Sequence, residues 1–114
     1  MLLFLCFSMY SLNGFAAFNE NESEQLFAIN NKSQKKVDEI VSSLNDTQME
    51  QIKNNPEITT QINELRHSWD ITIEKRCALE TVEFKGADAE ISAVNDCLVK
   101  GYKEELDYFS NMLP

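Results

Sequence analysis

The chain has 114 residues, with 10 basic and 19 acidic side chains and a formal net charge of −9 at pH 7. A chain of this length forms one small domain, which excludes a multidomain enzyme. Because no run of basic residues is longer than a pair such as Lys35-Lys36, the sequence predicts no nucleic-acid partner, which would require concentrated positive charge. With only three Gly and two Pro, the composition favours a small all-α domain over a β-barrel.

Residues 1–16 form an uncharged segment in which 12 side chains are apolar. This segment is shorter than the roughly 20 apolar residues of a membrane-spanning helix, and it ends in Gly14-Phe15-Ala16, a small-x-small cleavage pattern. We therefore expect a signal peptide at 1–16 and a periplasmic or secreted protein that has no membrane contact after cleavage. The alternative is a retained segment that is buried or anchors the chain to a membrane.

Residues 17–54 are polar and are expected to form an N-terminal arm with one or two short helices. One amphipathic helix begins near Ser33, because apolar residues follow with the i, i+3, i+4, i+7 spacing of a helix face, at Val37, Ile40, Val41 and Leu44. Asp46 or Thr47 can cap a short helix after it.

Residues 55–114 are expected to fold as an antiparallel helical hairpin. Asn55-Pro56 is a helix start, Gly86 ends the first helix and Asp88 caps the second. The first apolar stripe contains Ile58, Ile62, Leu65, Trp69, Ile73, Cys77, Leu79 or Glu80, Val82 and Phe84. The matching stripe contains Ile91, Val94, Leu98, Tyr102, Leu106, Phe109 and Leu113.

Cys77 and Cys97 are the two cysteines left after the predicted leader. They lie nine residues before and eleven residues after Gly86, so an antiparallel pair of helices brings them to nearly the same height. In an exported protein this predicts a disulfide, which closes a loop of about 20 residues and stabilises the fold by about 3 kcal/mol. The alternative is a pair of reduced, buried thiols.

No constellation of residues predicts catalysis, a cofactor or a metal. His67 is the only histidine and has no second nitrogen or thiol ligand beside it, while Ser68 and Asp70 follow it too closely on one helix to align as a triad. There is no glycine-rich phosphate loop. The acidic clusters are interpreted as a solvated face, because a hairpin offers no cleft for a glycosidase pair; they contain Glu80, Glu83, Glu104, Glu105 and Asp107.

The pattern of Trp69, then Cys77 eight residues on, then a turn with Gly86, then Cys97-Leu98, resembles the LprI-type lysozyme inhibitor family of exported bacterial proteins. The resemblance covers about residues 58–113. It implies a disulfide-linked helical hairpin with Trp69 as a core residue, and it implies inhibition of lysozyme. The chain departs from the family pattern at Ile73, Tyr102 and Glu105, where members commonly carry Arg, Thr and Arg.

The predicted function is therefore that of an exported inhibitor that binds lysozyme, or another basic protein, by protein–protein contact. Carboxylates flanking an aromatic ring suit such a partner, and the candidate contact residues on the last helix are Tyr102, Glu104, Glu105, Asp107 and Tyr108. The alternative for these residues is that Tyr102 belongs to the core and the carboxylates are simply solvated. The alternative function is a structural or host-interaction module without lysozyme activity.

Overall fold

The computed structural model describes the backbone of residues 2–112 and the side chains of residues 21–112. Within that part of the chain there are three α-helices and no strand: α1 (Leu2–Asn54), α2 (Thr59–Glu80) and α3 (Glu90–Asn111). Short 3-10 helices, η1 (Pro56–Ile58) and η2 (Val82–Phe84), connect them. The all-α prediction is confirmed, whereas the predicted leader 1–16 and Leu113 lie outside the residues whose side chains are described.

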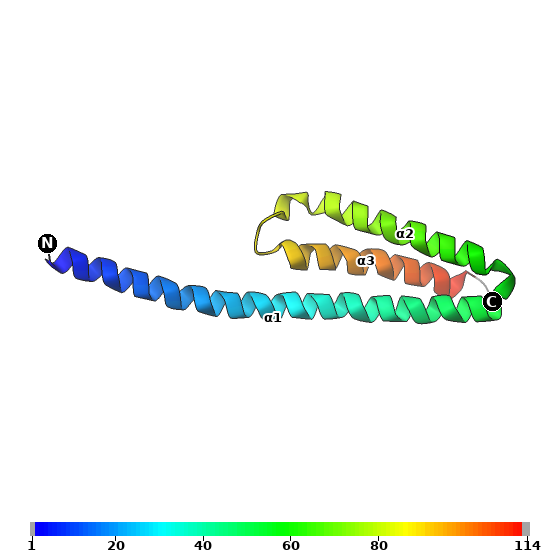
Figure 1. Cartoon of the computed structure of the whole chain (residues 1–114), viewed down its shortest axis with the longest axis horizontal. Helices are drawn as coiled ribbons and strands as arrows, with labels where there is room; N and C mark the ends of the chain where they lie inside the picture. The colour runs from blue at the N-terminus through cyan, green and yellow to red at the C-terminus, as the bar shows by residue number, and fades with distance from the viewer. Residues whose placement is uncertain (1, 113–114) are drawn as a thin grey trace.

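The molecule is a rod of 82 × 23 × 17 Å. Its length comes from α1, which has 53 residues, whereas α2 and α3 have 22 each. Figure 1 shows α3 lying between α1 and α2, with α1 continuing past the bundle toward the N-terminus. Along the chain, α2 returns antiparallel to α1, and α3 then runs antiparallel to α2 and parallel to α1.

α1 is one continuous helix of 53 residues. The expectation of one or two short helices within 17–54 is therefore wrong. The apolar periodicity was interrupted because α1 buries polar side chains, Ser33 and Gln51, in line with Val37 and Leu44. A prediction based only on the spacing of apolar residues therefore divides this single helix into several short ones.

The turns differ from the prediction in detail. The helix expected to start at Pro56 begins as η1 and becomes α-helical at Thr59, and α2 ends at Glu80, before the expected Gly86. Gly86 lies in the connection with φ of 80°, a conformation that glycine adopts without the steric cost of a side chain. The N-cap of α3 is Ala89 rather than Asp88, and the Gly86 N–H donates to the Glu90 carboxylate at 3.3 Å instead.

The core is assembled from all three helices. Its buried apolar side chains are Val37, Leu44, Ile62, Ile73, Cys77, Tyr102 and Phe109. Two of these come from α1, so the segment expected to be a polar arm supplies part of the hydrophobic core. At the α2–α3 contact, a Cβ added at Gly101 would lie 2.7 Å from the Ile73 side chain, so the two helices approach closely there.

Candidate functional site

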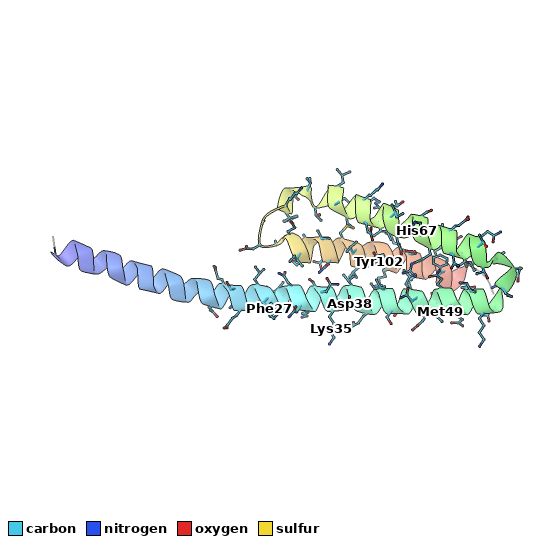
Figure 2. The ribbon with its side chains drawn as sticks, in the orientation of Figure 1. Phe27, Lys35, Asp38, Met49, His67 and Tyr102 are labelled. Carbon is cyan, nitrogen blue, oxygen red and sulfur yellow. A yellow bond between two sulfur atoms is a disulfide. The ribbon has the colours of Figure 1, made fainter. Side chains whose placement is uncertain are left out.

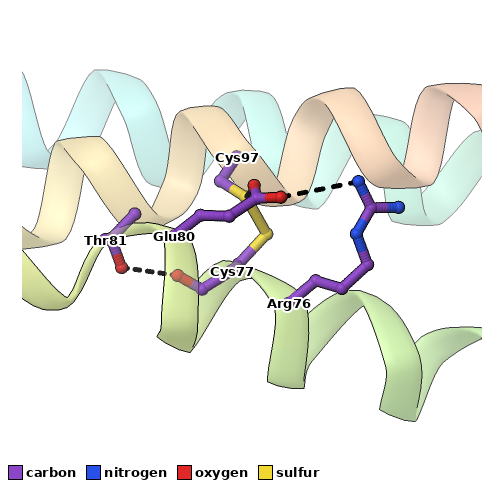
Figure 3. The surroundings of a disulfide bond; sticks show 5 residues. All are labelled: Arg76, Cys77, Glu80, Thr81 and Cys97. Carbon is purple, nitrogen blue, oxygen red and sulfur yellow. Dashed lines mark hydrogen bonds and ion pairs between the residues drawn. A yellow bond between two sulfur atoms is a disulfide. The ribbon is translucent and has the colours of Figure 1, made fainter.

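The disulfide joins α2 to α3 at one end of their contact. Cys77 and Cys97 are bonded, with their Cα atoms 5.6 Å apart, which confirms the predicted pairing. Cys77 is buried and Cys97 is half-buried. The Thr81 hydroxyl donates to the Cys77 carbonyl, which fixes the end of α2 beside the bridge (Figure 3).

The surface over the disulfide carries mixed charge. One Glu80 carboxylate oxygen lies 3.3 Å from the Cys97 sulfur, and the other lies 3.5 Å from the Arg76 guanidinium (Figure 3). A cavity of about 110 Å³ opens here, lined from α2 by Ile73, Arg76, Cys77 and Glu80 and from α3 by Cys97, Lys100, Gly101 and Glu104. Since two cations and two anions surround it, this cavity has no net preference for a charged ligand.

The five contact residues predicted on α3 divide between the interior and the surface. Tyr102 and Glu105 are 7% and 0% exposed, so the prediction that they belong to an accessible binding surface is wrong. Figure 2 shows Tyr102 among the three helices. The structure agrees with the alternative that Tyr102 is a core residue. Glu104 and Asp107 are exposed, and Tyr108 is 47% exposed.

Tyr108 is held in an aromatic cluster. Its ring centroid lies 5.3 Å from that of Trp69 on α2 and 5.5 Å from that of Phe109, while Trp69 and Phe109 are 6.2 Å apart. Tilted and edge-on pairs at these distances are favourable beyond the area they bury. Trp69 is half-buried and packs against the core, and its ring also contacts the ring of Tyr108. The half-exposed Tyr108 ring is therefore fixed in place, with Glu104 and Asp107 within one helical turn of it.

A polar junction joins the three helices and was missed by the sequence analysis. Arg66 of α2 makes an ion pair with Asp70 at 2.9 Å and with Glu105 of α3 at 3.4 Å. The same guanidinium donates to Asn45 and Gln48 of α1, at 2.9 and 2.8 Å. We call the group Arg66, Asp70, Glu105, Asn45 and Gln48 the polar junction.

Burial changes the acid–base behaviour of the polar junction. Desolvation, together with a hydrogen bond to Asp70 and the negative charge of Asp70, raises the pKa of Glu105 from 4.5 to about 8, although Arg66 opposes the shift. Burial and the negative charges of Asp70, Glu74 and Glu105 also raise the pKa of Tyr102, whereas the positive charge of Arg66 lowers it. A carboxyl group of raised pKa can serve as a general acid. Glu105, however, is fully enclosed and cannot touch a substrate in this conformation.

One signal for the buried Glu105 was present in the sequence. Glu105 lies three residues after Tyr102 and four before Phe109, which is the spacing of the buried face of a helix. Its partners, Arg66 and Asp70, lie more than 30 residues away, and no local pattern predicts that they meet it.

The described residues contain no group of three or more metal-ligating side chains, and His67 is exposed (Figure 2). Among residues that the structure describes, no helix is long and apolar enough to cross a membrane. No protein-family model, curated protein or solved structure matches the chain.

Proposed function

We propose that this protein is an exported binding protein that inhibits lysozyme through the outer face of α3. The observation that carries the proposal is the fixed, half-exposed Tyr108 ring flanked by two exposed carboxylates, Glu104 and Asp107. Interface hot spots are commonly aromatic side chains held in one conformation, because little conformational entropy is then lost on binding. We call Glu104, Asp107 and Tyr108 the α3 outer face.

Charge supports a basic partner. The chain carries a net charge of −9, so long-range attraction would draw a basic protein such as lysozyme toward it. Such attraction mainly raises the association rate, and it weakens as salt rises from about 50 to 200 mM because the Debye length shortens to below about 10 Å. The resemblance of Trp69, Cys77 and Cys97 to the lysozyme inhibitor pattern selects lysozyme among basic partners.

The test is inhibition of lysozyme in a turbidity assay, with binding kinetics measured in parallel on animal-type and goose-type enzymes. We expect the double variant Glu104→Lys/Asp107→Lys to slow association, and Tyr108→Ala to weaken binding by about tenfold or more through faster dissociation. The matched control is Asp46→Lys/Glu50→Lys, which makes the same change in net charge at exposed positions of α1. Equal losses in the two charge-reversal variants would assign the effect to net charge and contradict a specific face.

The second candidate is a structural or host-interaction module, for which the exposed apolar side chains of α1 are the favouring observation. Phe27, Ile29 and Met49 are 69%, 53% and 68% exposed, and Figure 2 shows Phe27 and Met49 on this helix. Absence of lysozyme inhibition at micromolar protein, together with a concentration-dependent oligomer on a sizing column, would favour this candidate.

A further inference from the structure

Three buried oxygen atoms of the polar junction accept no hydrogen bond, although one of them lies 3.4 Å from Arg66. These are both carboxylate oxygens of Glu105 and Oδ1 of Asp70. Asp70 Oδ2 already accepts from Arg66, so one guanidinium faces two carboxylates, of which Glu105 is fully buried and Asp70 is partly exposed. Buried polar atoms without partners are costly, and an uncompensated buried charge is more so.

One proton shared by the two carboxyl groups would give two of these oxygen atoms hydrogen-bond partners and remove one of the two negative charges. Arg66 Nε lies 2.9 Å from Asp70 Oδ2 and 3.4 Å from Glu105 Oε1, so the two carboxyl groups meet at one guanidinium nitrogen. If Glu105 carries a proton, its O–H donates to Asp70, and the junction then holds one positive and one negative charge. Two of the three orphaned oxygens gain a partner, and Arg66 balances the remaining carboxylate.

We propose that the Glu105–Asp70 pair is a proton-controlled latch, which holds α2 against α3 while Glu105 is protonated and releases that contact when Glu105 loses its proton to solvent. The inference concerns the fold alone and does not depend on the proposed function. The disulfide keeps α2 and α3 joined at Cys77 and Cys97, so release is confined to the part of α2 before the bridge.

The charged groups around Glu105 act on its ionisation in opposite directions, and burial together with Asp70 outweighs Arg66. Asp70 from α2 repels an ionised Glu105 and Arg66 from α2 attracts it, while from α1 the neutral amides Asn45 and Gln48 accept hydrogen bonds from Arg66. On α3 itself, Tyr102 has a raised pKa and therefore stays neutral while Glu105 titrates. The pKa of Glu105 in the closed fold, raised to about 8, is the upper limit of the pH at which the latch opens.

The sign of the stability effect follows from proton counting. The folded chain holds a proton on Glu105 up to about pH 8, whereas the unfolded chain releases it near pH 4.5, so raising the pH between these values favours unfolding. We expect the equilibrium constant for unfolding to rise by up to about tenfold per pH unit from this one group.

Trp69 reports the opening directly, because it is the only tryptophan and it bridges α2 to the aromatic rings of α3. The experiment follows Trp69 emission of the oxidised full chain from pH 6 to pH 9.5. We expect a reversible red shift with a midpoint no higher than about pH 8 in the parent protein. In Glu105→Gln, whose amide can donate to Asp70 without titrating, we expect no such transition.

Glu104→Gln is the matched control, since Glu104 is the exposed neighbour of Glu105 and should leave the transition unchanged. Flat emission in the parent protein across this range would overturn the proposal even if Glu105→Gln failed to fold. An unchanged transition in a folded Glu105→Gln would do the same.

Discussion

α3 makes two contacts of different construction, one with each of the other helices. The α2–α3 contact has a covalent bridge at Cys77–Cys97, a close approach at Gly101 and an aromatic cluster at its far end. The α1–α3 contact has no covalent link among the described residues. It combines apolar packing around Val37 and Leu44 with two buried hydrogen bonds, Asn95 to Ser33 at 3.0 Å and Gln51 to the Phe109 carbonyl at 2.7 Å.

The two contacts also differ in the length of chain that they close. The disulfide joins residues 20 apart, whereas the two buried hydrogen bonds of the α1–α3 contact join residues 62 and 58 apart. Closing a longer loop costs more chain entropy, although the cost grows only slowly with length. The nearby pair of helices is thus secured by a bond, and the distant pair depends on side-chain packing and complementary polar groups.

Breaking the α1–α3 contact should have the largest effect. Leu44 is fully buried, so Leu44→Ala removes apolar contact and leaves a cavity, with an expected loss of about 3 to 5 kcal/mol in the free energy of unfolding. Urea unfolding followed by Trp69 fluorescence and by circular dichroism measures it. Met49→Ala, at an exposed position of the same helix, is the control and should cost less than about 0.5 kcal/mol. A loss below about 1 kcal/mol for Leu44→Ala would mean that α1 contributes little to the core.

Removing the covalent bridge from the α2–α3 contact is the next largest change. Cys77→Ser/Cys97→Ser should lower the free energy of unfolding by about 3 kcal/mol, mainly because the unfolded chain gains freedom when the 20-residue loop is opened. Non-reducing peptide mapping of the parent protein should recover the two cysteines in one linked species. Recovery of two free thiols from the folded protein would contradict this account of the contact.

The close approach at Gly101 offers a finer test. In Gly101→Ala the new Cβ would meet the Ile73 side chain at 2.7 Å, which should cost about 1 to 3 kcal/mol through overpacking. Combining it with Ile73→Ala makes room for the added methyl group, so a double-mutant cycle should show favourable coupling between the two substitutions. Additive effects would mean that helix propensity or backbone conformation at residue 101, rather than helix approach, determines the cost.

The contact that closes a short loop could be predicted from the sequence, and the other could not. The position of Gly86 between two cysteines at similar distances indicated the disulfide from local spacing. Nothing comparable pairs Ser33 with Asn95 or Arg66 with Glu105, because those residues meet only after three helices have packed. Of the expected contact surface, Glu104, Asp107 and Tyr108 are accessible, while Glu105 was assigned to solvent because a carboxylate normally avoids burial unless it is paired.

The buried pair of Asn95 and Ser33 also has a consequence for alignment. Sliding α3 along α1 by one helical turn, about 5.4 Å, would still bring apolar side chains together, since the stripe repeats at that interval. It would separate Asn95 from Ser33, and Gln51 from the Phe109 carbonyl, and so leave buried polar atoms without partners at both places. The two hydrogen bonds therefore discriminate against slipped packings and select one register for two parallel helices whose apolar surfaces alone would tolerate several.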